Sequence, residues 1–267
     1  MFDATARSFA ELRSLIDSSL HALLDGALLG DGPPHGSEVA RAVRYAMFSG
    51  GKRTRPALTL LAVQACGGDL QKAVPAACAI ECLHCASLIF DDMPCMDNAP
   101  ERRGVASAHV MFGEGMAVLA ALALLNRAYS LFGQHRALAM EAATCVAEII
   151  EGQAIDLQGR RERLHRKTRG LMRLSLTAGA IACGAMEADI HVLARCGEYV
   201  GEAYQMYDDF EDGDATSKSG ADELVAESKA ALQDRFGARG FPLLTAIDAI
   251  VAHFNVSHSN ERIVVAA

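Results

Sequence analysis

The sequence predicts an all-α protein, and three observations support that prediction. Half of the 267 residues are apolar, aromatic residues are few, and Trp is absent, a composition that favours helices over sheets. Apolar residues recur at helical spacing through most of the chain. Gly, Pro and Ser residues, which end or begin helices, fall between these stretches. Because no linker, repeat or low-complexity segment divides the chain, we expect a single domain over residues 1–267.

Residue types at the boundaries justify the predicted helices in order. Ser37 can cap the second helix, because its hydroxyl can accept a hydrogen bond from a backbone N–H group of the first turn. Pro56 opens the third helix, where a missing N–H group costs little, and Gly67 ends it. Helices are expected over 7–29, 37–48, 56–66, 70–92, 112–132, 137–157, 169–186 and 188–213, and again beyond 222.

Net charge and hydropathy exclude two classes of partner. The formal net charge is −8 and the isoelectric point is about 5.6, which argues against nucleic acid and gives no general attraction to anionic membranes. No uninterrupted apolar run reaches the length of about 18 residues that marks a membrane span, so we expect no transmembrane segment. An anionic substrate must therefore be captured locally, by a basic pocket and metal ions.

An acidic cluster ends the fourth predicted helix, and basic residues follow it. Three carboxylates lie within seven positions and two guanidinium groups within six more: Asp91, Asp92, Asp97, Arg102 and Arg103. Carboxylate oxygens suit hard cations such as Mg²⁺, and paired guanidinium groups suit phosphate oxygens. Pro94 turns the chain, which matters because Asp91 and Asp97 would face different ways on an unbroken helix. The combination indicates a magnesium–diphosphate site.

A second acidic cluster, at Asp208, Asp209 and Asp212, also ends an apolar helix. Asp208 and Asp212 are one helical turn apart and share a face. Two such clusters could hold Mg²⁺ ions around one anionic substrate. The alternative is that each cluster is a solvated helix end, and the recurrence of the same apolar-then-acidic pattern weighs against it.

A basic turn precedes the third predicted helix. Lys52, Arg53 and Arg55 follow two glycines and crowd the start of that helix. They would meet an anion already favoured by free backbone N–H groups and the helix dipole. The alternative is an ordinary solvated basic turn.

Together these motifs resemble those of the trans-isoprenyl diphosphate synthase family, of the plant geranylgeranyl diphosphate synthase type. The matching motifs are Gly50-Gly51-Lys52-Arg53-Thr54-Arg55-Pro56, Asp91-Asp92-x4-Asp97, Arg102-Arg103-Gly104, Gly152-Gln153, Lys167-Thr168 and Gln205-x2-Asp208-Asp209-x2-Asp212. The similarity covers roughly residues 10–215. It implies a helical bundle of the isoprenoid synthase type around a central cavity.

The resemblance implies head-to-tail prenyl transfer, in which isopentenyl diphosphate attacks the allylic cation left by a departing diphosphate. Metal ligands for Mg²⁺ are then expected at Asp91, Asp92, Asp97, Asp208, Asp209 and Asp212. Isopentenyl diphosphate is expected to bind Lys52, Arg55, His84 and Arg103. The allylic diphosphate is expected to bind Arg102, Lys167, Thr168 and Gln205.

Several features depart from the family pattern. Residues 98–100, Asn-Ala-Pro, stand where family members usually continue the first motif with acidic residues, and Phe90 replaces a residue that is commonly His. After Asp212 the family has a Gly- and Lys-rich loop that closes over the diphosphates, then a Lys-x2-Tyr-Pro segment, whereas this chain offers only residues 213–222. Without that lid we expect weaker metal–diphosphate binding and poor shielding of the cation.

The eight cysteines lie mostly in apolar runs, as expected of buried free thiols in a reducing compartment. Cys78 and Cys82 share a helix face and could form a zinc site with His84, an alternative that their apolar setting disfavours. The resemblance offers another use. Small, non-catalytic subunits of these synthases carry a Cys-x3-Cys pattern connected with pairing, so Cys78 and Cys82 are expected to be partner-binding residues.

We therefore interpret the chain as the small, catalytically weak or inactive subunit of a heteromeric geranyl/geranylgeranyl diphosphate synthase. It would bind a catalytic geranylgeranyl diphosphate synthase subunit and modulate its output. The apolar run 112–132 suggests a central helix or a subunit contact, and Leu122 replaces an acidic residue that is common in the family. The family implies a plastid (chloroplast) location, although residues 1–6 are too few for a transit peptide.

Three other interpretations stay open. The first is a self-sufficient homodimeric Mg²⁺-dependent prenyltransferase that makes farnesyl or geranylgeranyl diphosphate. The second is a class I terpene cyclase, which shares the first acidic motif but normally mixes Asn/Asp, Ser/Thr and Glu in the second and lacks the basic turn. The third is an interaction protein whose acidic motifs are relics.

Overall fold

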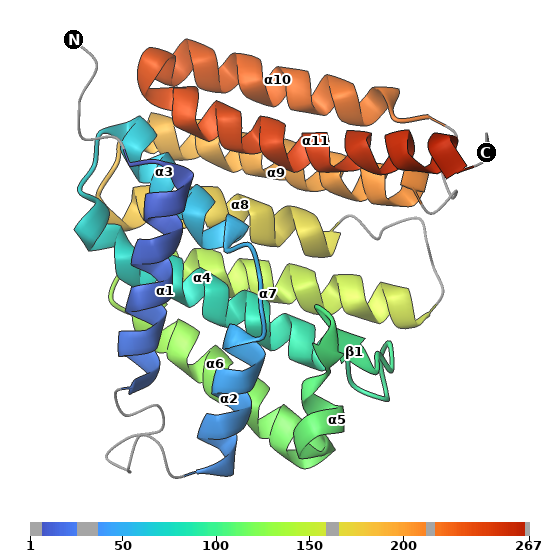
Figure 1. Ribbon diagram of the computed structural model, residues 1–267. Coiled ribbons are helices and arrows are strands. Elements are labelled where there is room, and N and C mark those ends of the chain that lie inside the picture. The colour runs from blue at the N-terminus through green and yellow to red at the C-terminus, as the bar shows by residue number, and fades with distance from the viewer. Residues whose placement is uncertain (1–6, 26–36, 159–165, 212–216, 265–267) are drawn as a thin grey trace. The chain divides into compact units, whose positions relative to one another are not determined.

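The computed structural model describes residues 7–25, 37–158, 166–211 and 217–264, and it confirms the all-α fold class (Figure 1). Its α-helices are α1 (Phe9–Asp25), α2 (Glu38–Phe48), α3 (Thr54–Cys66), α4 (Leu70–Asp91), α5 (Ala108–Phe112), α6 (Glu114–Phe132), α7 (Arg136–Leu157), α8 (Arg166–Ala182), α9 (Glu187–Glu211), α10 (Ser219–Phe236) and α11 (Phe241–Val264). A 3₁₀ turn, Gly237–Gly240, joins the last two helices. One short hairpin, β1 (Glu101–Arg102) and β2 (Val105–Ala106), was not expected from the sequence.

The helix boundaries follow the local signals in the sequence. The hydroxyl of Ser37 accepts a hydrogen bond from the backbone N–H of Ala40 at 3.1 Å, which confirms the predicted cap of α2. Gly67, with φ +71°, ends α3 as expected. Helix α1 was expected to reach residue 29 and is described to Asp25, with residues 26–36 outside the described part of the chain.

The contacts within the chain define two compact units. Unit 1 comprises Met1–Ser8, Leu58–Ala73 and Glu141–Ala267, and unit 2 comprises Phe9–Ala57 and Val74–Met140. The boundaries fall inside α3, α4 and α7. The expectation of one domain stays a prediction.

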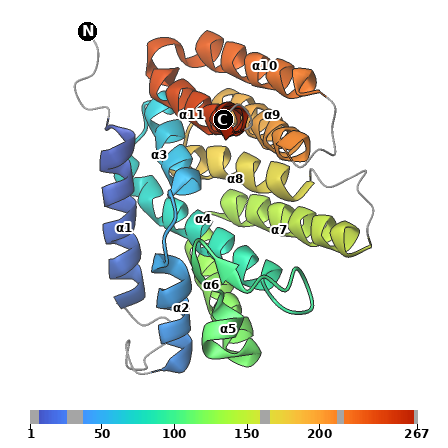
Figure 2. The same ribbon diagram turned by 45° about the vertical axis from the view of Figure 1, so that its right-hand side comes forward.

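In unit 1, α8 packs closely against α3. The Thr59 hydroxyl of α3 donates to the backbone carbonyl of Ser175 at 2.7 Å. One turn further along α8, a Cβ on Gly179 would lie only 2.4 Å from the carbonyl oxygen of Thr59, so a glycine is required for this approach. Helix α9 lies beside α8, and α10 and α11 cover α9 in both views (Figures 1 and 2).

Arg173 of α8 joins three helices of unit 1. Its guanidinium donates to Glu141 at 2.8 Å and Glu148 at 3.0 Å, both on α7, and to Glu198 of α9 at 3.4 Å. Burial alone would lower the pKa of Arg173, but these carboxylates outweigh it and the pKa is raised. The cluster fixes α7, α8 and α9 against one another within unit 1.

In unit 2, α1 buries one apolar stripe and is joined to α2 by side-chain contacts. The buried side chains of α1 are spaced by four residues: Leu12, Ile16, Leu20 and Leu24. The rings of His21 and Phe48 stack with centroids 3.9 Å apart. The guanidinium of Arg44 donates to Asp25 at 2.6 Å. These contacts align α1 with α2.

Arg53 lies at the centre of unit 2 and is 5% exposed. Its guanidinium donates to Glu81 of α4 at 2.7 Å, to Asp17 of α1 at 2.8 Å, and to the backbone carbonyl of Met47 in α2 at 2.7 Å. Burial alone would lower the pKa of Arg53, but the two carboxylates outweigh it and raise the pKa. One side chain therefore joins three helices.

Two helices are long and apolar enough to cross a membrane by length and composition alone: α4 and α6. In α4, 67% of the 18-residue apolar stretch is buried inside the protein, as in a core helix. In α6 only 39% is buried. The expectation of no transmembrane segment stays a prediction.

Candidate functional site

The first acidic motif forms a tight turn at the end of α4. The backbone N–H of Asp97 donates to the carbonyl of Asp91 at 2.9 Å, and that of Ala99 donates to the carbonyl of Asp92 at 3.2 Å. The chain therefore folds back, as expected from Pro94, and returns Asp97 to the end of the helix. Asp91 and Asp92 are buried, whereas Asp97 is exposed.

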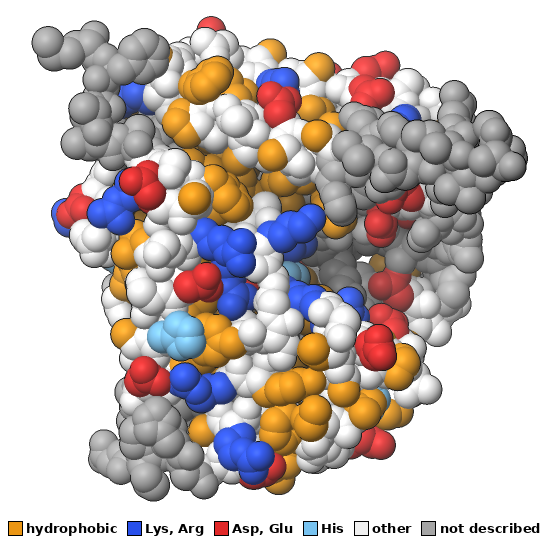
Figure 3. Space-filling view, viewed as in Figure 1, with side chains coloured by type: hydrophobic (Ala, Val, Ile, Leu, Met, Phe, Trp, Pro, Cys, Tyr) orange, Lys and Arg blue, Asp and Glu red, His pale blue; other side chains and the backbone are white. Residues whose placement is uncertain are grey.

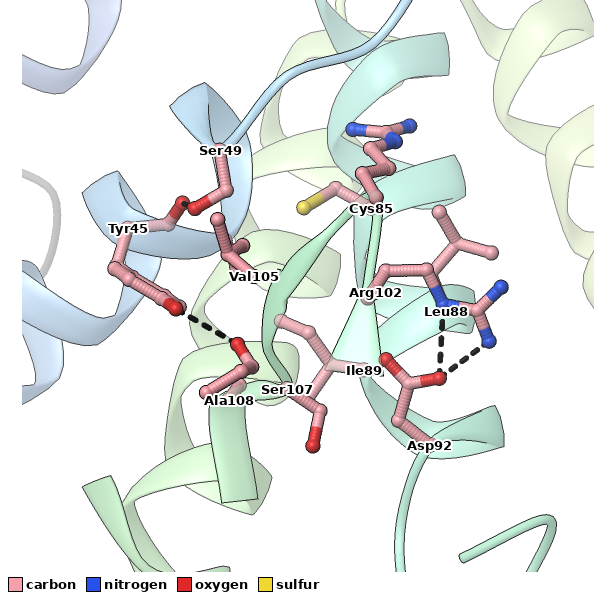
Figure 4. A pocket seen from close by; sticks show the side chains of 13 residues that line it. Tyr45, Ser49, Cys85, Leu88, Ile89, Asp92, Arg102, Val105, Ser107 and Ala108 are labelled. Atoms are coloured by element: carbon pink, nitrogen blue, oxygen red, sulfur yellow. Dashed lines mark hydrogen bonds and ion pairs between the residues drawn. The ribbon is translucent and has the colours of Figure 1, made fainter. Parts of the chain in front are cut away.

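Asp92 forms an ion pair with Arg102. Arg102 Nε donates to Asp92 Oδ1 at 2.9 Å, and its Nη2 contacts the same oxygen (Figure 4). The hydrogen bond to Asp92 is the main cause of the raised pKa of Arg102. An expected metal ligand and an expected phosphate ligand thus neutralise each other in this structure.

The hairpin places Arg103 beside the basic turn. Its strands pair Glu101 with Ala106 and Arg102 with Val105, and Arg103 stands in the turn with φ +57°. Arg103 Nη1 donates to the carbonyl of Gly50 at 2.6 Å. At Gly51, with φ +125°, a Cβ would lie 2.8 Å from the same nitrogen. Glycine at this position permits the close approach of the guanidinium.

The basic turn divides its side chains between the surface and the interior. Lys52 is exposed, and Figure 3 shows Lys and Arg side chains gathered at the surface around the start of α3. Arg53, in contrast, points inward to Glu81, so the expectation that it meets an anion is wrong. The sequence pattern does not reveal this, because the positive φ of +54° at Arg53 redirects its side chain.

Arg55 lies next to His84, which is on α4. Arg55 Nη1 is 3.3 Å from His84 Nε2. Since a guanidinium can only donate, the imidazole nitrogen accepts and the ring is neutral. Burial, with the charges of Arg55 and Arg103, holds the pKa of His84 well below its usual range. The structure thus brings two of the residues expected to bind isopentenyl diphosphate, Arg55 and Arg103, within electrostatic range of a third, His84.

The second acidic motif, in unit 1, is connected to α8 by a short hydrogen-bond chain. The Thr168 hydroxyl donates to Gln205 Oε1 at 3.2 Å, and Gln205 Nε2 donates to Asp209 Oδ1 at 3.1 Å. The structure therefore joins two expected phosphate ligands to one expected metal ligand. Asp212 and the side chain of Lys167 lie outside the described residues.

Tyr207, beside the second motif, is a residue that the sequence reasoning missed. It is 1% exposed, and its hydroxyl donates to Asp222 Oδ1 of α10 at 2.5 Å. Burial and this carboxylate raise the pKa of Tyr207. The contact fixes α10 next to α9 soon after the motif.

Cys78 and Cys82, expected to contact a partner, lie inside unit 2. Their exposed fractions are 3% and 0%, and burial raises the pKa of Cys78 to about 12. Both residues are buried, which argues against a direct contact of their side chains with another subunit. Their place in α4 instead matches that of small apolar core residues.

The donor chemistry of the acidic motifs fits Mg²⁺. Among the described residues, no three His, Cys, Asp or Glu side chains converge into a preformed metal cage. Mg²⁺ does not require one, because it usually keeps several waters and is bound by one or two carboxylates together with substrate phosphates. The carboxylates that the turn at the end of α4 gathers, among them the exposed Asp97, suit that mode of binding.

Comparison with known proteins gives consistent matches. Residues 37–223 match the family model described as polyprenyl synthetase. A protein named putative geranylgeranyl pyrophosphate synthase 8, chloroplastic, from Arabidopsis thaliana is 37% identical over 73% of this chain and 60% of its own length. The heterodimeric geranylgeranyl pyrophosphate synthase small subunit, chloroplastic, of the same plant is 34% identical over 82% of this chain and 78% of its length. This chain thus spans less than two thirds of the first relative.

Solved structures give the same result. A geranyltranstransferase from Thermotoga maritima is 26% identical with a TM-score of 0.81, covering 92% of this chain and 98% of the other. An FPP/GFPP synthase from Zymomonas mobilis is 28% identical with a TM-score of 0.75, covering 91% and 99%. The isoprenoid synthase fold expected from the motifs is confirmed.

Proposed function

Because this chain belongs to the polyprenyl synthetase family, we propose that it is the small, catalytically weak or inactive subunit of a heteromeric geranyl/geranylgeranyl diphosphate synthase. It binds a catalytic geranylgeranyl diphosphate synthase subunit and modulates the prenyl diphosphates that the complex makes. The match to a plant small subunit supports this role, because it extends over most of both chains. The chloroplastic names of the plant relatives support a plastid location.

The observation that carries the proposal is the outward α6 face. From residue 115 to residue 132, the exposed positions of α6 carry no charge: Gly115, Leu119, Leu122, Asn126, Tyr129 and Ser130. Leu119 and Leu122 are 45% and 49% exposed. A helix that faces water normally carries charged residues on its outer side, and an outer face without charge that exposes Leu side chains is typical of a protein contact.

Helix α5 extends this uncharged surface. Val110 and Met111 are 54% and 51% exposed, and α5 packs against α6 within unit 2. Figure 3 shows hydrophobic side chains at the surface in the region of α5. A second subunit that covers the α5 and outward α6 surfaces would remove these side chains from water, which favours association.

Three features support weak catalysis by the chain alone. Asp92 is paired with Arg102 rather than open to a cation. Residues 98–100 follow the first motif without further carboxylates, and residues 213–222 form a shorter connection than the family lid. A site that closes incompletely shields a reactive cation poorly from water.

The chemistry assigned to the site uses charged and neutral groups in separate roles. Isopentenyl diphosphate binds Lys52, Arg55, His84 and Arg103. The allylic diphosphate binds Arg102, Lys167, Thr168 and Gln205. Mg²⁺, when bound by Asp91, Asp92, Asp97, Asp208, Asp209 and Asp212, supplies positive charge that stabilises a departing diphosphate. His84 stays neutral and orients Arg55 by accepting its N–H group.

A charge on the outward α6 face tests the subunit role. Mixing the chain with a plant catalytic geranylgeranyl diphosphate synthase should give a complex by size-exclusion chromatography with light scattering. Leu119→Glu should weaken that complex at least tenfold, since it buries a carboxylate in the contact. Leu157→Glu is the matched control, because Leu157 is 55% exposed at the end of α7 and belongs to neither α5 nor α6. No complex with the unmodified chain, or equal loss in both variants, would contradict the proposal.

The second candidate is a self-sufficient homodimeric Mg²⁺-dependent prenyltransferase. It is favoured by the retention of all six motif aspartates, and by similarity to solved structures named as FPP/GFPP synthase and geranyltranstransferase. Purified chain supplied with Mg²⁺, isopentenyl diphosphate and dimethylallyl diphosphate distinguishes the two, because only the second candidate turns over rapidly without a partner.

A further inference from the structure

The hairpin β1–β2 carries two of the expected phosphate ligands and is too small to be stable by itself. It consists of only two residue pairs, Glu101 with Ala106 and Arg102 with Val105. A two-stranded hairpin is marginally stable in water even when longer. A small pocket, partly open to solvent, lies between the hairpin, α2 and α4, so apolar packing beneath the hairpin is incomplete. Its position must depend on a few specific contacts.

Two of these contacts are made by the arginines themselves. Arg102 pairs with Asp92 of α4, and Arg103 donates to the carbonyl of Gly50. The proposed function assigns both arginines to diphosphates and Asp92 to a metal ion. These contacts therefore compete with the ligand for the same groups and weaken when it binds.

Tyr45 of α2 makes a contact that does not compete with the ligand. Its hydroxyl donates to the backbone carbonyl of Ala106 at 2.7 Å, on the opposite side of the pocket from the pair Arg102–Asp92 (Figure 4). The Tyr45 ring meets Phe112 edge-to-face, with centroids 5.3 Å apart and an interplanar angle of 71°. The ring is thus fixed by packing, and its hydroxyl fixes β2 without using any charged group.

We infer that Tyr45 is a positioning residue, whose hydroxyl keeps the hairpin over the basic turn while Arg102 and Arg103 exchange their protein partners for an anionic diphosphate. The inference rests on the proposed function, because it requires these arginines to bind such a ligand. Tyr45 itself touches neither ligand nor metal. Loss of its hydroxyl should loosen the hairpin and weaken diphosphate binding.

The test compares Tyr45→Phe with Tyr199→Phe. The first variant keeps the ring against Phe112 and removes only the hydrogen bond to Ala106. The control removes a hydroxyl in unit 1, where the Arg195 side chain donates to Tyr199 at 2.9 Å. Hydrogen exchange of a peptide that spans 101–107 is measured on the unliganded chain. Isopentenyl diphosphate binding is measured by calorimetry without metal, so neither readout requires turnover.

Tyr45→Phe should speed exchange in the hairpin and weaken isopentenyl diphosphate binding by about fivefold each, as expected for the loss of one hydrogen bond. Tyr199→Phe should change neither. In an Arg103→Gln background, Tyr45→Phe should cost little further affinity for isopentenyl diphosphate, because Tyr45 acts on that ligand through Arg103. A purely structural role predicts additive losses instead, and additivity would overturn the inference.

The outcomes separate this inference from the proposed function. If the unmodified chain binds no isopentenyl diphosphate, the diphosphate site assigned under the proposed function fails. The hydrogen-exchange rates of the hairpin peptide still test the contact of Tyr45 with Ala106. Equal rates in Tyr45→Phe and in the unmodified chain would show that the Tyr45 hydroxyl does not hold the hairpin. If the unmodified chain binds and Tyr45→Phe binds equally well, the positioning role is overturned while the proposed function stands.

Discussion

Replacing Arg53 by Met tests the ion pair that joins the helices of unit 2. The side chains of Arg53 and Glu81 are 4% and 3% exposed, and their atoms Nη1 and Oε1 are 2.7 Å apart. Met fills much of the same volume but removes the charge, which leaves the Glu81 carboxylate buried without its partner. Removing one member of a buried pair costs about 3–5 kcal/mol.

Arg41 provides a matched control for this magnitude. It pairs with Glu38 over the same 2.7 Å, but these side chains are 66% and 48% exposed. An ion pair in water contributes about 0–1 kcal/mol. With the same distance and the same substitution, the difference between Arg53→Met and Arg41→Met therefore reports burial together with the further hydrogen bonds of Arg53 to Asp17 and Met47.

Thermal unfolding followed by circular dichroism measures the difference. Arg53→Met should lower Tm by about 10 °C and Arg41→Met by about 2 °C or less. The double variant Arg53→Met/Glu81→Met should recover much of the loss, because it leaves no unpaired charge in the interior. Equal and small shifts in the two single variants would refute the view that Arg53 joins these helices through a buried pair.

Two other predictions concern the residues around the basic turn. His84 has a pKa well below its usual range, because burial and the charge of Arg55 oppose its protonation. Its contribution to stability is therefore present above about pH 6.5 and lost as the pH falls, so Tm should drop more steeply towards about pH 5 in the unmodified chain than in His84→Gln, which does not titrate. Parallel Tm curves would contradict this. Gly51→Ala places a Cβ 2.8 Å from Arg103 Nη1 at a φ of +125°, and should weaken isopentenyl diphosphate binding about tenfold in calorimetry. Gly115→Ala, which meets nothing within 4 Å, should not, and equal affinity in both variants would count against the geometry of the turn.

The helices could be predicted because their signals are local. Ser37 at the start of α2 and Gly67 at the end of α3 each act on the backbone of their own turn, so no distant contact is needed to read them. The turn after Asp91 was expected for the same reason, since Pro94 interrupts the helix. The hairpin was not predicted, because two residues per strand are too few to show an alternating pattern.

Side-chain direction at the site required the structure. Arg53 belongs to a basic cluster in the sequence, yet its contacts are Asp17 and Glu81, which lie 36 positions upstream and 28 downstream. Tyr45 likewise contacts Ala106, 61 positions away. Charge and spacing in the sequence identify the candidate ligand-binding residues, whereas long-range packing decides which of their side chains face a ligand.

We propose that this chain acts by changing the rate or the product length of a catalytic partner. The most direct measurement is product formation from Mg²⁺, isopentenyl diphosphate and dimethylallyl diphosphate by the chain alone, by a plant catalytic geranylgeranyl diphosphate synthase alone, and by an equimolar mixture. We predict little turnover by the chain alone and, in the mixture, a rate or product length that differs from the catalytic subunit alone. Rapid turnover by the isolated chain, or a mixture equal to the sum of its parts, would contradict that claim.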